Sequence, residues 1–233
     1  YIVTATRMGY VKKSDLMLYS NIRQTGIIGV VIEEGDSLIG AEITDGTHEL
    51  LLCTRGGNCI RFHEEQVRSM GRASRGVTGI SLRDDDEVVS MTTIPETEGD
   101  DERTLLTVCE FGYGKRTDLS EYRDQNRAGK GIITIKTTER NGVVVGTLVV
   151  REDDDVMMIT AGGQMIRIPA SSVSVVGRNT QGVRLITLRE EDERVASVER
   201  LPLEEHEEAQ EALDGGDPSL ESEDLVDGEP DAE

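Results

Sequence analysis

Short apolar runs, glycine turns and polar connections follow one another in the same order four times along most of the chain. Each copy opens on an apolar run, and a glycine turn leads to a second run that ends in a positive charge. A polar connection then reaches a basic motif with its own glycine, and two more strand-like stretches follow, separated by a charged turn. The apolar–polar alternation has the period of half-buried β-strands, and no stretch shows a sustained helical period.

The two glycines of each copy keep a close register. Gly9, Gly57, Gly112 and Gly163 each precede a Lys or Arg by four residues and are separated by intervals of 48, 55 and 51 residues. The motif glycines Gly26, Gly76, Gly131 and Gly182 recur at 50, 55 and 51. We therefore infer four repeats, about 1–46, 47–101, 102–154 and 155–203. Four short strands in about 50 residues are typical of a propeller blade, so the sequence predicts an all-β, propeller-like fold with about four four-stranded blades.

The charge is concentrated at one end. The net charge is −21, but residues 203–233 carry 14 acidic residues and no Lys or Arg, and without them the chain has 32 acidic and 25 basic residues, a net charge of −7. Residues 204–233 lack periodicity and apolar content, which predicts a disordered acidic tail. Three cysteines favour a reducing cytoplasm, and no apolar run is long enough for a membrane helix.

Several stretches resemble the C-terminal domain of the A subunit of bacterial DNA gyrase. They are SMGRASRGVTGISL, FGYGKRT, TERNGVVVG and SVVGRNTQGVRLI. The resemblance implies a β-pinwheel, a six-bladed wheel whose blades exchange a strand, of which this chain would hold four. It also implies that the domain bends DNA around its rim, within a heterotetramer of gyrase A and gyrase B subunits. The family's box QRRGGKG is matched at five of seven positions by the loop of Gln125, Asn126, Arg127, Ala128, Gly129, Lys130 and Gly131, so an intact box is expected upstream of Tyr1.

Positive charges recur at two places in each copy, after the first turn and around the motif glycine. We predict that they contact the DNA backbone, with acidic turns facing elsewhere and the glycines letting backbone amides approach phosphates. The predicted contacts are Lys12, Lys13, Arg23, Arg61, Arg68, Arg72, Arg75, Lys115, Arg116, Arg123, Arg127, Lys130, Arg167, Arg178 and Arg184.

Backbone neutralisation can offset the cost of bending DNA. Bending roughly 40 bp through half a turn costs on the order of 10 kcal/mol. The binding free energy from about eight to ten phosphate contacts can offset such a cost, and it makes binding steeply dependent on salt. No recognition helix or aromatic array is evident, so sequence-specific reading of bases is not expected.

No catalytic site is evident. The five tyrosines lack a neighbouring base or metal cluster, and there is no P-loop, so ATP and Mg²⁺ would belong to other parts of the holoenzyme. Cys53, Cys59 and His63 do not have the spacing of a zinc site, and the aspartate runs 84–86 and 153–155 lack a calcium-loop pattern, so no metal site is predicted.

Two other functions remain open. One is the corresponding domain of the topoisomerase IV A subunit, which binds DNA without imposing the same wrap. The other is a protein-interaction propeller, although the repeats lack the Trp-Asp endings of that class and the chain contains no Trp. The acidic tail is expected either to compete with DNA for the basic rim or to aid solubility.

Overall fold

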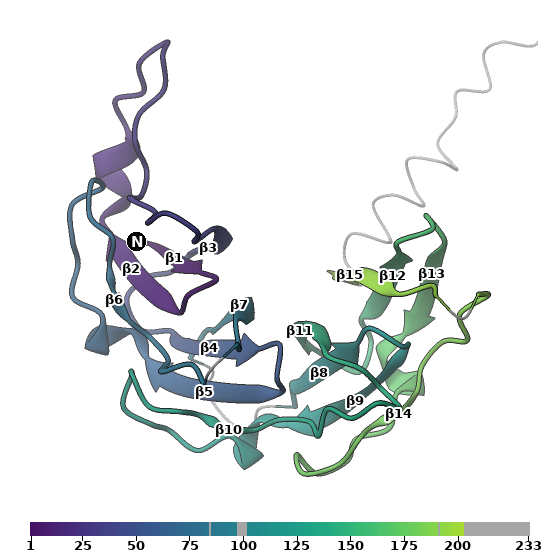
Figure 1. Ribbon diagram of the computed structural model, residues 1–233. Helices are drawn as coiled ribbons and strands as arrows, with labels where there is room; N and C mark the ends of the chain where they lie inside the picture. Colours follow the sequence, from purple (N-terminus) through teal and green to yellow (C-terminus); the bar gives the residue numbers. More distant parts are fainter. Residues whose placement is uncertain (84, 97–101, 191, 203–233) are drawn as a thin grey trace, which may run out of the picture.

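A computed structural model describes residues 1–83, 85–96, 102–190 and 192–202. Four antiparallel sheets follow one another around an open arc (Figure 1). We number them blades 1 to 4 in chain order. In the described residues the only helices are four short 3-10 turns: η1 (Leu16–Tyr19), η2 (Glu64–Gln66), η3 (Leu119–Glu121) and η4 (Ala170–Ser172). The predicted acidic tail, 204–233, lies outside the described residues, and no helix in the described part is long and apolar enough to cross a membrane.

Each repeat builds three strands of its own blade, and repeats 2 to 4 each send one strand to the blade before. Blade 1 has the order β3 (Leu38–Ile43), β1 (Ile2–Thr6), β2 (Tyr10–Ser14), β6 (Val77–Thr78). Blade 2 has β7 (Val88–Ile94), β4 (Glu49–Thr54), β5 (Asn58–His63), β10 (Ile132–Ile133). Blade 3 has β11 (Val144–Val150), β8 (Thr104–Cys109), β9 (Tyr113–Asp118), β14 (Val183–Arg184). Strands β6, β10 and β14 come from the following repeat, as the resemblance to a strand-exchanging wheel implied.

Blade 4 differs from the expectation of four-stranded blades. It has three strands in the described residues, β13 (Met165–Pro169), β12 (Asp155–Thr160) and β15 (Val195–Leu201). The missing position is the one that a following repeat fills in the other blades. At the opposite end, the motif stretch of the first repeat forms no strand, and Ile28 is 65% exposed. The equivalent stretches of the later repeats form β6, β10 and β14, which pair with the preceding blade. No blade precedes blade 1 in the described residues.

The core lies between neighbouring blades. Along β4, Leu50 and Leu52 pack toward blade 1, while Leu51 and Cys53 pack with residues of blade 3. Successive side chains of a strand point to opposite faces, so a strand covered on both faces becomes a continuous apolar run. Strand β12 alternates between buried and half-buried positions, because in the described residues blade 4 has a neighbouring blade on one face only. Cys53 and Cys59 are fully buried thiols in this core.

The repeated glycines mark the points where the exchanged strands cross. Gly182 has a φ of +76°, and a Cβ there would lie 2.5 Å from the carbonyl oxygen of Gly114 in β9. Gly131 has a φ of +70°, and its Cβ would lie 2.7 Å from the carbonyl oxygen of Cys59 in β5. The close approach that these glycines permit is therefore to the backbone of the preceding blade. This packing role accounts for the two glycines, and the approach of their amides to a phosphate stays a prediction.

Candidate nucleic-acid interface

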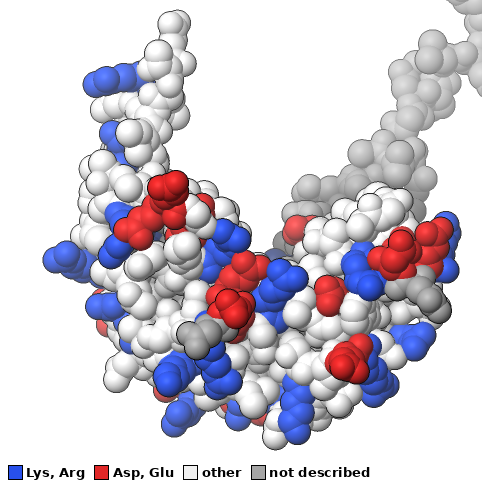
Figure 2. All heavy atoms as spheres, viewed as in Figure 1, with Lys and Arg blue, Asp and Glu red and all other residues white. Residues whose placement is uncertain are grey.

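The connections that carry the basic motifs run along the outer, convex side of the arc, where β6, β10 and β14 lie (Figure 1). The inner strands β3, β7, β11 and β15 line the concave side and a groove between them. On the face drawn in Figure 2, most Lys and Arg side chains follow the convex edge, while several acidic clusters lie closer to the concave side. This segregation agrees with a positive track on a domain of negative net charge.

Four of the predicted contacts are buried and do not belong to that surface. Lys12, Lys13, Lys115 and Arg116 are 0–7% exposed. The ammonium of Lys115 donates to the carbonyl oxygens of Gly177 and Arg178, both at 2.6 Å. Burial lowers the pKa of Lys115 to about 8 and also lowers the pKa of Lys12. Because their donors are used inside the protein, we remove these four cations from the set of backbone contacts.

In the first three repeats, the charge after the first turn holds the next blade. The guanidinium of Arg61 donates to the carbonyl oxygen of Leu119 at 2.8 Å, and that of Arg116 donates to the carbonyl oxygen of Val173 at 2.8 Å. Lys13 donates to the carbonyl oxygen of Glu64 at 3.0 Å. These carbonyls belong to the 3-10 turns or the residue after them. In blades 1 to 3 this cation reaches the neighbouring blade, which gives a structural reason why a positive charge recurs at this position.

The motif arginines have a second structural role. Arg72, Arg127 and Arg178 donate respectively to the carbonyl oxygens of Ile28 at 2.6 Å, Thr78 at 3.0 Å and Ile133 at 2.9 Å. Each acceptor lies two residues after the motif glycine of the preceding repeat. The three side chains belong to half-buried residues, and they join the outer segments of successive repeats.

The remaining seven predicted contacts belong to exposed residues: Arg23, Arg68, Arg75, Arg123, Lys130, Arg167 and Arg184. Two of them are paired with carboxylates, Arg75 with Glu33 and Arg167 with Asp155. For the other five, no carboxylate of the described residues lies within 4 Å. Exposed cations without such partners are the groups best able to exchange their counterions for DNA phosphates.

The box-like loop, 125–131, packs against the second repeat. The backbone N–H of Arg127 donates to the side-chain oxygen of Gln66 at 2.9 Å, and the Gln66 amide donates to the carbonyl oxygen of Gln125 at 3.2 Å. Asn126 and Lys130 are exposed. The loop thus combines an inter-blade attachment with an exposed positive charge.

Ala128 occupies a backbone conformation that favours glycine, with a φ of +64°. We expect Ala128→Gly to raise the free energy of unfolding by about 1 kcal/mol, because the left-handed region costs an L-residue roughly that much. Urea denaturation measures the change. Ala196→Gly, in the extended strand β15, is the control and should lose about 0.5–1 kcal/mol. Destabilisation by both substitutions would contradict the argument.

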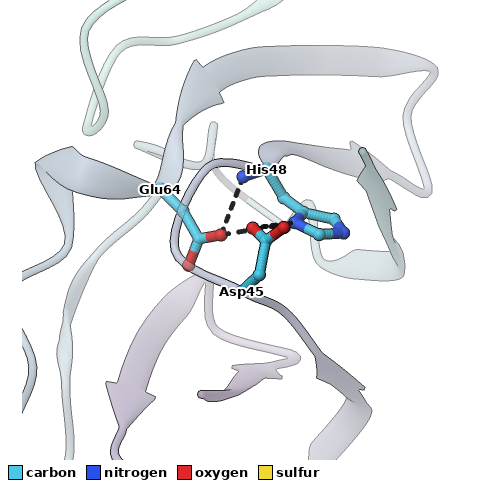
Figure 3. Close-up of side chains that lie close together, drawn as sticks. All are labelled: Asp45, His48 and Glu64. Atoms are coloured by element: carbon cyan, nitrogen blue, oxygen red, sulfur yellow. Dashed lines mark hydrogen bonds and ion pairs between the residues drawn. The ribbon is translucent and has the colours of Figure 1, made fainter. Parts of the chain in front are cut away.

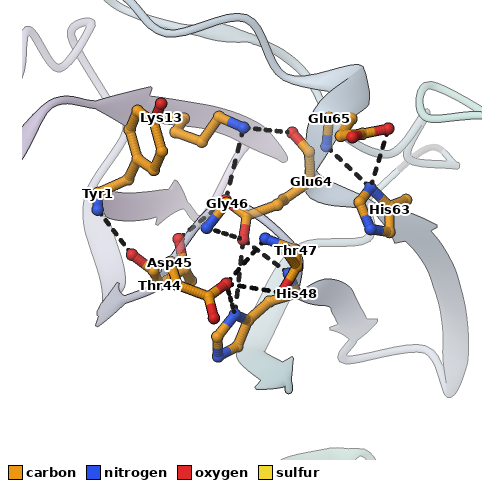
Figure 4. A network of polar contacts seen from close by, with 10 residues as sticks. All are labelled: Tyr1, Lys13, Thr44, Asp45, Gly46, Thr47, His48, His63, Glu64 and Glu65. Carbon is orange, nitrogen blue, oxygen red and sulfur yellow. Dashed lines mark hydrogen bonds and ion pairs between the residues drawn. The ribbon is translucent and has the colours of Figure 1, made fainter. Parts of the chain in front are cut away.

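A polar network that the sequence did not reveal joins blades 1 and 2. The Glu64 carboxylate is fully buried and accepts hydrogen bonds from the Thr44 hydroxyl at 2.8 Å and from the backbone N–H groups of Gly46 at 3.1 Å and His48 at 2.8 Å (Figure 4). The ammonium of Lys13 lies 3.5 Å from the same carboxylate. Pairing with these donors offsets the free-energy cost of burying the carboxylate.

Asp45, His48 and Glu64 form the one group of three potential metal ligands found in the described residues (Figure 3). The His48 Nδ1 lies 3.0 Å from an Asp45 oxygen and 3.6 Å from a Glu64 oxygen. Asp45 also accepts from the backbone N–H and hydroxyl of Thr47, and these bonds lower its pKa to about 2. Since protein donors already surround both carboxylates, the arrangement is best explained as a turn that carries the chain from blade 1 to blade 2.

Sequence reasoning also missed one exposed cation of the outer side. Arg140 lies in the turn 138–142, which was expected to face away from the basic motifs. The structure places its guanidinium over the ring of Tyr113, 4.8 Å from the centroid, where Arg184 also lies. The available signal was that this turn, TERNG, is the one that has an arginine at its centre.

The geometry described so far defines a strand-exchanged β-propeller with a basic outer edge, and sequence comparisons identify its family. A family model described as the DNA gyrase C-terminal domain, β-propeller, matches residues 1–45, 48–95, 103–151 and 154–202. The chain belongs to the DNA gyrase A C-terminal domain family.

Individual relatives agree. The chain is 47% identical to the A subunit of DNA gyrase from Salmonella typhimurium over 92% of its own length and 24% of the relative's. It is 45% identical to the A subunit of DNA gyrase from Haloquadratum walsbyi over 87% of its own length and 23% of the relative's. The chain therefore spans about a quarter of these relatives.

Two solved domains have similar structures. A DNA gyrase A C-terminal domain matches with a TM-score of 0.77 and 25% identity, covering 87% of this chain and 66% of that one. The C-terminal domain of DNA topoisomerase IV matches with a TM-score of 0.82 and 26% identity, covering 92% and 66%. The TM-scores and sequence identities of these two structures do not distinguish a gyrase domain from a topoisomerase IV domain. The family model and the relatives above favour gyrase.

Proposed function

We propose that this chain is the non-catalytic DNA-binding and DNA-wrapping domain of a gyrase A subunit. The observation that carries the proposal is the row of exposed cations, without carboxylate partners among the described residues, in the outer connections of successive repeats. Arg68 and Arg123 occupy equivalent places, each directly after the buried anchor that follows a 3-10 turn, Val67 or Tyr122. Repetition of one charge on successive blades supports contact with a repetitive partner, and the duplex backbone is such a partner.

Curvature supports wrapping in addition to binding. The blades follow an arc (Figure 1), and most Lys and Arg side chains on the face drawn in Figure 2 follow its convex edge, so a duplex that contacts several blades along that edge has to bend around it. Such binding depends on the backbone and on DNA deformability and requires no base contacts. In the assembled enzyme, the domain would act with the rest of gyrase A and with gyrase B, giving strand passage a fixed handedness and negative supercoils.

The proposal is tested with a triple variant in which Arg68, Arg123 and Lys130 become alanine. We expect weaker binding to a 40 bp duplex and a salt dependence of the association constant that is flatter by about 0.9 per lost contact. Fluorescence anisotropy from 50 to 200 mM salt measures both. Arg200→Ala is the matched control, because Arg200 lies on the inner strand β15 and pairs with Asp154. Equal affinity and salt slope in the triple variant and the wild type would contradict the proposal.

Wrapping has its own readout. A relaxed circular DNA is incubated with the chain and then with topoisomerase I. Its distribution of topoisomers should be shifted if the duplex wraps around the domain with a fixed handedness. The corresponding topoisomerase IV domain would bind without the same shift. A protein-interaction propeller would show neither binding nor a shift.

A further inference from the structure

Two arginines converge on one tyrosine at the outer end of blade 3. Tyr113 begins β9 and is 7% exposed, and Arg184 of β14 is its direct cross-strand partner. The Arg184 guanidinium donates to the Tyr113 hydroxyl at 2.8 Å and lies 5.2 Å from the ring centroid. The Arg140 guanidinium, from the turn between β10 and β11, lies 4.8 Å from the same centroid. Three segments from two repeats therefore meet at this ring.

The turn that carries Arg140 is held in place before any ligand arrives. Asn141 is fully buried, and its amide donates to the carbonyl oxygens of Lys136 at 2.9 Å and Gln181 at 3.0 Å. Its side-chain oxygen accepts from the backbone N–H of Thr138 at 2.8 Å. Gln181 lies two residues before β14, the strand that contains Arg184. Asn141 consequently ties together the backbone segments that carry the two arginines, so less backbone freedom is lost when both arginines contact one ligand.

Blade 1 contains a similar contact between an arginine and a tyrosine, with its charge balanced. There Arg75, from the following repeat, lies over the ring of Tyr10 at 4.4 Å, and the turn of the first repeat supplies Glu33, which pairs with Arg75. In blade 3, the turn beside the tyrosine supplies Arg140 in place of an acid. No carboxylate of the described residues lies within 4 Å of Arg140 or Arg184. The first cluster is neutral and the second carries two uncompensated positive charges.

Two guanidiniums at one hydroxyl repel each other unless an anion lies between them. Arginine forks match phosphate oxygens in geometry, and charge-assisted bonds of this kind are about twice as strong as neutral ones. The Arg184 guanidinium donates to the tyrosine hydroxyl, the nearby Arg140 and Arg184 lower the pKa of Tyr113, and its own O–H remains able to donate outward. We propose that Arg140, Arg184 and the Tyr113 hydroxyl form a preorganised site for one phosphodiester of duplex DNA. The site rests on the proposed function and adds Arg140 and Tyr113 to it.

The test compares Arg140→Ala and Arg184→Ala with Arg200→Ala in the full chain. Arg200 lies on the inner strand β15, pairs with Asp154 and is not one of the predicted DNA contacts, so it is the control. Each of the first two variants should weaken duplex binding about fivefold to tenfold at 0.1 M salt and flatten the salt slope by about 0.9, the values for one lost phosphate contact. Arg200→Ala should stay within twofold of the wild type. Circular dichroism verifies that each variant is folded.

The outcomes separate the site from the proposed function. Salt-dependent binding that is lost in the Arg68, Arg123 and Lys130 variant but unchanged in Arg140→Ala and Arg184→Ala would overturn the site alone. Absence of salt-dependent binding in the wild type would overturn both. A second arm follows the arginine side-chain resonances by NMR with inorganic phosphate. Shifts confined to Arg140 and Arg184, with duplex affinity unchanged in their variants, would mean a free-phosphate site and would also overturn the proposal.

Discussion

Gly182→Ala is expected to lower the free energy of unfolding by about 2–5 kcal/mol. About 1–2 kcal/mol comes from placing an L-residue at positive φ, and the rest comes from a Cβ that would lie 2.5 Å from a backbone carbonyl oxygen of β9. Neither β14 nor β9 can move aside without losing the pairing between them. Urea denaturation followed by circular dichroism measures the loss.

Gly26→Ala separates the two causes. Gly26 is the equivalent motif glycine of the first repeat, with a φ of +77°, but nothing lies within 4 Å of the position that a Cβ would take there. This substitution should therefore cost only the conformational part, about 1–2 kcal/mol. Equal losses at the two positions would show that the crossing of strands is not what requires glycine.

Glu64→Ala is expected to cost about 3–5 kcal/mol of unfolding free energy. It removes a buried carboxylate and leaves the Lys13 ammonium, whose side chain is 8% exposed, without its charge partner. It also leaves the Thr44 hydroxyl and two backbone N–H groups without their acceptor. The same denaturation experiment gives the value.

Glu65→Ala is the control for this prediction. Glu65 is the next residue, its side chain is 79% exposed, and its partner is His63 at the surface. Surface substitutions of that kind usually change stability by no more than about 0.5 kcal/mol. A loss below about 1 kcal/mol for Glu64→Ala would mean that the network does not couple blades 1 and 2.

Periodicity was sufficient to predict the repeats and their strands. Gly57 and Gly131, for example, were aligned with their counterparts from sequence alone, because a repeated fold requires the same turn at the same place. The alternation in each copy likewise predicted the inner strand, such as β7, that closes each blade. Turns and strands of this kind depend on residues that are close together in the chain, so they can be predicted from the sequence.

Burial of the cations could not be predicted in the same way. The ammonium of Lys12 donates to the carbonyl oxygen of Arg72, 60 residues later in the chain. Whether such a side chain faces water depends on a segment that arrives from the next repeat. Lys12 and the exposed Arg68 look equally basic in the sequence, and only the strand exchange distinguishes them. The charge pattern therefore indicated the outer side of the fold without separating its structural cations from its exposed ones.

The exchange of strands also makes the dependence of one blade on its neighbour directional along the chain. Each of blades 1 to 3 is completed by the repeat that follows it, so unfolding of repeat 4 would remove β14 and expose the edge of β9. Loss of repeat 1 would take away no strand from blade 2. The stability of such arrays is the sum of the free energies of the single repeats and of the contacts between neighbours. Here the strand contributed to a neighbour always goes to the preceding blade. Unfolding should therefore spread from later repeats to earlier ones more readily than in the reverse direction.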